Sequence, residues 1–79
     1  MKVQVKLFTY FQKYCPEGNE RGLFTLNLVP PVSVGDLLQK LGIPTDYARV
    51  VHVNGKFAKD ENILKDGDFV AVFPPLPGG

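Results

Sequence analysis

The sequence has very few of the residues from which small proteins build disulfides and metal sites. It contains one cysteine, Cys15, and one histidine, His52. A lone cysteine excludes an internal disulfide, and no CxxC pair is present to suggest a bound metal. The sequence also lacks a phosphate-binding glycine loop and a nucleophile–base pair. We therefore expect a protein that is not an enzyme and that binds no metal or cofactor itself.

The sequence also has no excess of one charge and no long apolar run. Nine lysines and arginines stand against eight aspartates and glutamates, which gives no argument for nucleic-acid binding. No apolar stretch approaches the length of a membrane span. The first residues alternate polar and apolar side chains, unlike the apolar core of a signal peptide. At 79 residues, the chain is expected to form one small cytoplasmic domain.

Two segments near the start of the chain alternate strictly between polar and apolar residues. Residues 2–8, KVQVKLF, and residues 23–29, LFTLNLV, are each predicted to form a half-buried strand. The segment between them contains proline and glycines, so the strands are expected to form an antiparallel hairpin with a long loop. Residues 10–14 can form a short helical turn at the start of this loop.

Residues 34–41 are predicted to form the one main helix, because their apolar residues recur at helical spacing. Ser33 is a favourable N-cap, and Asp36 three residues later can complete a capping box. Gly42 followed by Pro44 is a typical end of a helix.

Three further strands are predicted in the second half, at residues 49–53, 56–58 and 69–73. Asn54-Gly55 is a strong signal for the tight turn between the first two.

Within the last strand, Val70 and Val72 must share one face, which leaves Phe69 and Phe73 on the other. In the loop before it, Ile63 and Leu64 are both expected to fill the core.

The resulting element order is ββαβββ. One helix can cover one face of a mixed sheet of four to five strands. This packing buries the apolar face of the helix against the apolar face of the sheet. This order fits an α+β, β-grasp (ubiquitin-like) fold. We expect residues 1–73 to form the β-grasp domain and residues 74–79 to form an extended tail.

Three segments together resemble one known family. VNGKF, LKDGDFVAVFPP and the final GG are similar to segments of the MoaD/ThiS family of ubiquitin-like sulfur carriers. The tail is most similar to that of the small subunit of molybdopterin synthase (MoaD-like). The resemblance follows the whole chain in element order and is specific from Val53 to the end.

The resemblance implies a carrier that works with several enzymes. An E1-like enzyme of the MoeB/ThiF type uses ATP to adenylate the carboxylate of Gly79. A donor such as a cysteine desulfurase or rhodanese then supplies sulfur, which gives a thiocarboxylate. A large subunit of the MoaE type passes this sulfur to a cyclic pyranopterin phosphate. The product is molybdopterin, whose dithiolene binds molybdenum or tungsten.

The chemistry of the tail agrees with this role. Gly78 and Gly79 have no Cβ, so this end can enter a narrow channel in a partner protein. The tail prolines favour an extended rod that reaches roughly 18 Å, at about 3.1 Å per residue. We expect the rod to contact the partner through these residues: Pro74, Pro75, Leu76 and Pro77. The alternative is a loose chain end without a task.

Alternation also predicts a docking surface on the open face of the sheet. Phe8 and Phe73 are opposite in phase to core residues, and Phe57 can join them. The same positions are aromatic or apolar contact residues in the molybdopterin synthase family that the chain resembles. Phe69 enlarges this surface or is shielded by the tyrosines of the first loop. The alternative is that these are ordinary sheet residues, covered by loops of the domain itself.

Several other interpretations remain open. One alternative is a ThiS-like carrier, which donates sulfur to the thiazole of thiamine. Another is a ubiquitin-like modifier, which would be conjugated to other proteins through Gly79. A plain interaction domain would present the tail as a polyproline ligand. We interpret His52 as a surface or edge residue rather than a ligand or base, and Cys15 as an incidental loop thiol rather than a sulfur carrier.

Overall fold

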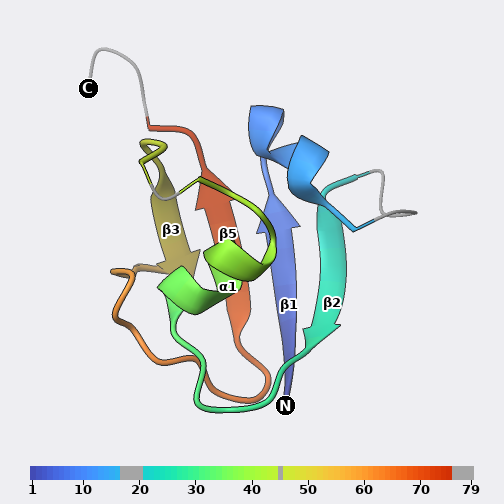
Figure 1. Ribbon diagram of the computed structural model, residues 1–79, viewed down its shortest axis with the longest axis vertical. Helices are drawn as coiled ribbons and strands as arrows, with labels where there is room; N and C mark the ends of the chain where they lie inside the picture. Colours follow the sequence, from blue (N-terminus) through green and yellow to red (C-terminus); the bar gives the residue numbers. More distant parts are fainter. Residues whose placement is uncertain (17–20, 45, 76–79) are drawn as a thin grey trace.

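A five-stranded mixed sheet with the order β2-β1-β5-β3-β4 organises the protein (Figure 1). The computed structural model describes residues 1–16, 21–44 and 46–75. β1 and β5 pair in parallel, and the other neighbours pair antiparallel. The strands are β1 (Lys2–Leu7), β2 (Leu23–Asn27), β3 (Val50–Val53), β4 (Lys56–Phe57) and β5 (Phe69–Phe73).

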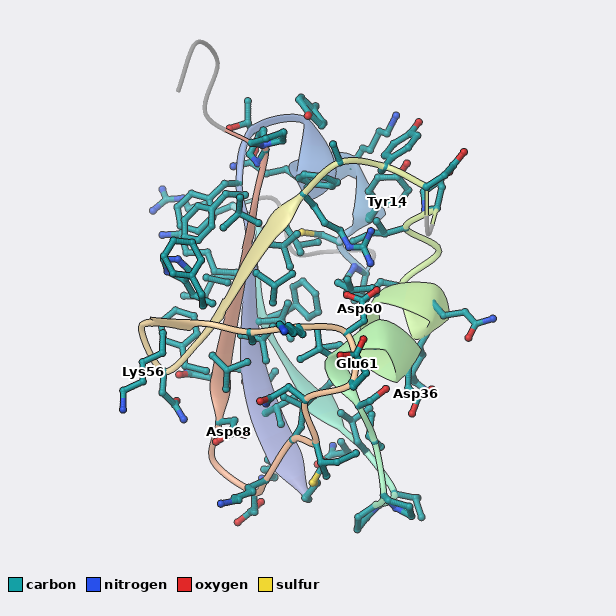
Figure 2. The ribbon with its side chains drawn as sticks, turned by 90° about the vertical axis from the view of Figure 1, so that its left-hand side faces the viewer. Tyr14, Asp36, Lys56, Asp60, Glu61 and Asp68 are labelled. Carbon is teal, nitrogen blue, oxygen red and sulfur yellow. The ribbon has the colours of Figure 1, made fainter. Side chains whose placement is uncertain are left out.

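The helix α1 (Val34–Lys40) follows the first hairpin and lies against one face of the sheet (Figure 1). In the view turned by 90°, α1 with Asp36 lies on one side of the strands, and Lys56 lies on the other (Figure 2). The predicted β-grasp arrangement and the order ββαβββ are therefore confirmed. Within the described residues, no helix is both long and apolar enough to cross a lipid bilayer.

The first hairpin has the predicted antiparallel register, from Lys2 opposite Asn27 to Lys6 opposite Leu23. Its long loop begins with a 3₁₀ helix, η1 (Thr9–Tyr14), where a short helical turn was expected. The loop returns to the sheet at Gly22, which has a φ of +78°. A Cβ at this position would collide with the carbonyl oxygen of Leu7, so only glycine fits here.

The ends of α1 form as the sequence predicts. The Ser33 hydroxyl accepts a hydrogen bond from the Asp36 N–H, and the Asp36 carboxylate accepts one from the Ser33 N–H, both at 3.0 Å. These reciprocal bonds form a capping box. At the other end, Gly42 has a φ of +83° and the Ile43 N–H donates to the Leu38 carbonyl at 3.0 Å. This is a Schellman ending, and Ile43 continues into the core.

The core lies between α1 and the sheet, and every buried side chain in the described part of the chain is apolar. The buried residues are Val3, Val5, Leu7, Phe11, Phe24, Leu28, Val34, Leu37, Leu38, Ile43, Val51, Leu64, Val70 and Val72.

The prediction that both Ile63 and Leu64 fill the core is wrong for Ile63. Leu64 is 3% exposed, whereas Ile63 is 57% exposed. Ile63 forms an antiparallel bridge with Ser33, so the backbone is extended at this point. Successive side chains of an extended backbone point to opposite sides, and only one of the two can face the core.

Candidate functional site

The tail leaves from the middle strand of the sheet. β5 is hydrogen-bonded to β1 on one side and to β3 on the other, and it runs directly into Pro74 and Pro75. At the last position of β5, Phe73 lies opposite Val50 of β3. The base of the tail is therefore held by two neighbouring strands, which gives it a defined direction. The predicted tail residues Leu76, Pro77, Gly78 and Gly79 lie outside the described residues.

An aromatic face, made of Phe8, His52, Phe57 and Phe73, lies on the side of the sheet away from α1. The rings of Phe8 and Phe73 stack with their centroids 4.5 Å apart. His52 meets Phe57 edge-on at 4.6 Å and Phe73 at 5.0 Å. The structure thus brings together Phe8 and Phe73, which alternation predicts on one face, and Phe57, which was expected to join them. It adds His52, which sequence reasoning had set aside.

Phe69 lies in phase with Phe73 on β5 and is 41% exposed. In the described part of the chain, its ring makes no contact with the rings of the aromatic face. The expected shielding tyrosines, Tyr10 and Tyr14, pack on Phe11 instead. Phe69 therefore extends the open surface without joining the aromatic face itself.

A concavity of about 390 Å³ lies beside the base of the tail. Its lining is almost entirely apolar and consists of Val50, His52, Phe57, Phe73 and Pro74. Among the residues described, the buried Nε2 atom of His52 has no hydrogen-bond partner. The aromatic face is thus hollowed where the tail begins, and the histidine that lines the hollow has a buried nitrogen without a partner.

The motif residues Asn54 and Asp68 have a structural task. Asn54 has a φ of +54° and Gly55 one of +84°, the signature of the tight hairpin turn that the sequence predicts. The Asn54 amide donates to the Asp68 carboxylate at 2.9 Å and accepts from the Phe69 N–H at 2.9 Å. The other oxygen of Asp68 accepts from the Lys65 N–H at 2.7 Å. This Asn54–Asp68 clasp ties the β3–β4 turn to the start of β5.

Cys15 follows η1 and is partly buried against the core. Burial raises the pKa of its thiol, and a hydrogen bond with the Gly22 backbone lowers it by a smaller amount. A raised pKa disfavours the reactive thiolate, which agrees with an incidental thiol. The described residues include no cluster of histidine, cysteine and carboxylate side chains that could hold a metal ion.

The comparisons with known proteins agree with this geometry. A model of the ThiS family matches residues 23–79. A putative molybdopterin converting factor subunit 1 from Pyrococcus furiosus is 27% identical with a TM-score of 0.74, over 95% of this chain and 98% of that chain. Subunits 1 and 2 of the molybdopterin-converting factor from Helicobacter pylori form a complex, in which the matching chain is 25% identical with a TM-score of 0.61, over the full length of both chains.

A third similar structure is SAMP1 from Haloferax volcanii, which is 24% identical with a TM-score of 0.74 over 100% of both chains. At this identity the likeness supports the ubiquitin-like fold alone. The family match covers well over half of the sequence, including β2 to β5 and the tail. The chain therefore belongs to the ThiS family, the ThiS/MoaD group of small ubiquitin-like sulfur carriers, which are carrier proteins rather than catalysts.

Proposed function

We propose that this protein carries sulfur for the synthesis of molybdopterin, as the small subunit of a molybdopterin synthase. Its reactive group is the carboxylate of Gly79, which becomes an adenylate and then a thiocarboxylate. The observation that carries the proposal is the origin of the tail. It leaves the central strand β5 beside an open aromatic face, so the domain can dock while the tail enters a partner.

The chain itself supplies the acyl carbon, and its partners supply the reagents. A carboxylate oxygen of Gly79 attacks the α-phosphorus of ATP, and pyrophosphate leaves. The terminal sulfur of a donor persulfide then attacks the acyl carbon, and AMP leaves. A second thiol cleaves the resulting S–S bond, which leaves the thiocarboxylate on Gly79 and a disulfide on the donor. Adenylation is needed because a free carboxylate is a poor electrophile.

Three partners follow from this chemistry. An E1-like enzyme of the MoeB/ThiF type binds ATP, and a cysteine desulfurase or rhodanese provides the persulfide. A large subunit of the MoaE type receives the thiocarboxylate, and the complex of subunits 1 and 2 from Helicobacter pylori supports this pairing. These steps take place in the cytoplasm, and the carrier binds no cofactor of its own.

Pyrophosphate exchange tests the first step. The chain is mixed with ATP, labelled pyrophosphate and the E1-like homologue from its own host. Label should enter ATP only when the chain is present, because adenylate formation is reversible. A variant with one alanine added after Gly79 should give no exchange, because the added side chain blocks the narrow site. Equal exchange with both proteins would contradict the proposal.

A second candidate is sulfur transfer to the thiazole of thiamine, which the match to the ThiS family favours. Deletion of the gene distinguishes the two acceptors. Loss of molybdenum- or tungsten-enzyme activity supports the first candidate, and a requirement for added thiamine supports the second. A ubiquitin-like modifier would instead leave Gly-Gly remnants of this chain on lysines of other proteins.

A further inference from the structure

His52 lies on an interior strand between two phenylalanine rings, which its sequence context does not predict. β3 is an interior strand, paired with β5 on one side and with β4 on the other. His52 lies opposite Ala71 on β5 and Phe57 on β4. The rings of Phe57 and Phe73 both pack against its imidazole. The imidazole therefore lies between two aromatic rings at the base of the tail.

The Nε2 atom of His52 is buried without a hydrogen-bond partner in the described part of the chain. A buried polar atom without a partner is unfavourable, because it has lost its bond to water and gained none. Few such atoms occur in native proteins, and each calls for a physical reason. A partner protein that supplies the missing bond would provide one.

Phe57 is the most exposed of the rings that pack against this imidazole. It lies on the two-residue edge strand β4 and is 82% exposed. So exposed a side chain is held by few contacts, and a change of its rotamer is easy. Rotation of Phe57 would open the imidazole to a side chain that enters the concavity.

The location of the concavity identifies the kind of partner. Pro74, the first residue of the tail, forms part of its wall. An extended tail from Pro74 to Gly79 reaches roughly 18 Å, at about 3.1 Å per residue. A partner that takes in the whole tail, from Gly79 back to Pro74, therefore lies against the surface around Pro74. The protein that receives the tail is thus the occupant of this concavity.

The lining also defines the chemistry of the entering group. Aromatic and aliphatic walls favour an apolar body, and the unpaired Nε2 can form one hydrogen bond with the entering group. A hydroxyl meets this need with either imidazole tautomer, because it both donates and accepts. Tyrosine matches best, since its ring packs on aromatic walls and its hydroxyl lies at the far end.

We propose that His52 determines partner specificity: the tail-receiving partner inserts a tyrosine-like side chain into the concavity and bonds its hydroxyl to Nε2. This inference rests on the proposed function, because that function defines the tail-receiving partner. A docking surface that recognised apolar area alone would have no use for a histidine here.

Two variants of the full-length chain test this proposal. His52→Phe keeps an aromatic ring and removes Nε2, whereas His52→Gln keeps a polar group at a similar reach. Binding of each to the MoaE-type homologue from the same host is measured by titration calorimetry. Thr25→Val on β2 is the control, because it removes a polar group that lies far from the concavity, exposed at the other edge of the sheet.

His52→Phe should bind about tenfold more weakly, because the partner hydroxyl is left unpaired in the interface. The same variant should unfold at an equal or higher temperature, because it removes a buried unpaired nitrogen. Weaker binding without a lower unfolding temperature would show that the variant has lost recognition of the partner rather than stability. His52→Gln and Thr25→Val should bind nearly as well as the wild type.

Equal or tighter binding by His52→Phe would overturn the inference and leave the proposed function intact. Equal losses of affinity in His52→Phe and His52→Gln would also overturn the inference. The shape of the side chain, rather than its hydrogen-bonding group, would then determine binding. If the wild-type chain does not bind the homologue at all, the proposed function fails and the inference fails with it.

Discussion

Apolar side chains lie on both faces of the sheet, but their surroundings differ. On β5, Val70 and Val72 point to the α1 side and are fully buried. Phe73 points to the other side and forms the wall of an open concavity with Phe57. The chain covers one face with its own helix, and no described element covers the other face. Apolar side chains on the first face therefore stabilise the fold, and those on the second are available to another protein.

The largest test truncates one phenylalanine on each side. Phe11 is fully buried, so Phe11→Ala should lower the free energy of unfolding by about 3–5 kcal/mol. Phe57 is largely exposed, so the matched Phe57→Ala should change it by less than about 0.5 kcal/mol. Urea denaturation measures both. Similar losses for the two variants would contradict the division between the faces.

The Asn54–Asp68 clasp belongs to neither face of the sheet. Its loss should cause the next largest decrease in the free energy of unfolding. Asn54→Ala removes its side-chain hydrogen bonds and places alanine at a positive φ, which should lower the free energy of unfolding by about 2–3 kcal/mol. Asn54→Gly tolerates the positive φ and should lose about 1 kcal/mol less. Thermal and urea denaturation compare the variants. Equal stabilities of the two would show that backbone strain has no part here.

The stacked rings of Phe8 and Phe73 test how much contacts within the open face contribute to the free energy of unfolding. Their centroids are 4.5 Å apart, so a double-mutant cycle to alanine should give a coupling free energy of about 0.5–1.5 kcal/mol. A cycle between Phe8 and Phe69 is the control and should give a value near zero. Coupling of the first pair above about 3 kcal/mol would mean that the open face is part of the core.

The smallest expected effect concerns Cys15, which is partly buried at the margin of the core. Because burial raises the pKa of its thiol, alkylation by iodoacetamide at mildly alkaline pH should be slower in the folded protein than in urea. Folding favours the neutral thiol. The resulting contribution to stability is therefore present below the usual thiol pKa and is lost as the pH rises through the raised pKa. Equal alkylation rates in the two states would show that Cys15 is exposed.

Much of the fold could be predicted because local patterns decide it. Alternation predicted β1, β2 and β5 and the sides to which Val70 and Phe73 point. Ser33 and Asp36 predicted the start of α1, because the capping box involves only neighbours in the sequence.

The errors concern features that depend on distant partners. The sequence predicts Ile63 in the core, but its bridge with Ser33 turns the side chain outward. Phe11 was not identified as a core residue, because a short 3₁₀ helix has no apolar period to detect. The surroundings of His52 depend on β3 pairing with both β4 and β5, which no local pattern reports.

The mass of the intact protein, purified from its own host, tests the central claim most directly. A sulfur carrier should include a fraction of the chain in which one oxygen is replaced by sulfur, located to Gly79 by fragmentation. A variant extended by one alanine and not trimmed should lack this form. If the wild-type chain carries no sulfur at Gly79 while its host is making the cofactor, the account of this protein as a sulfur carrier is contradicted.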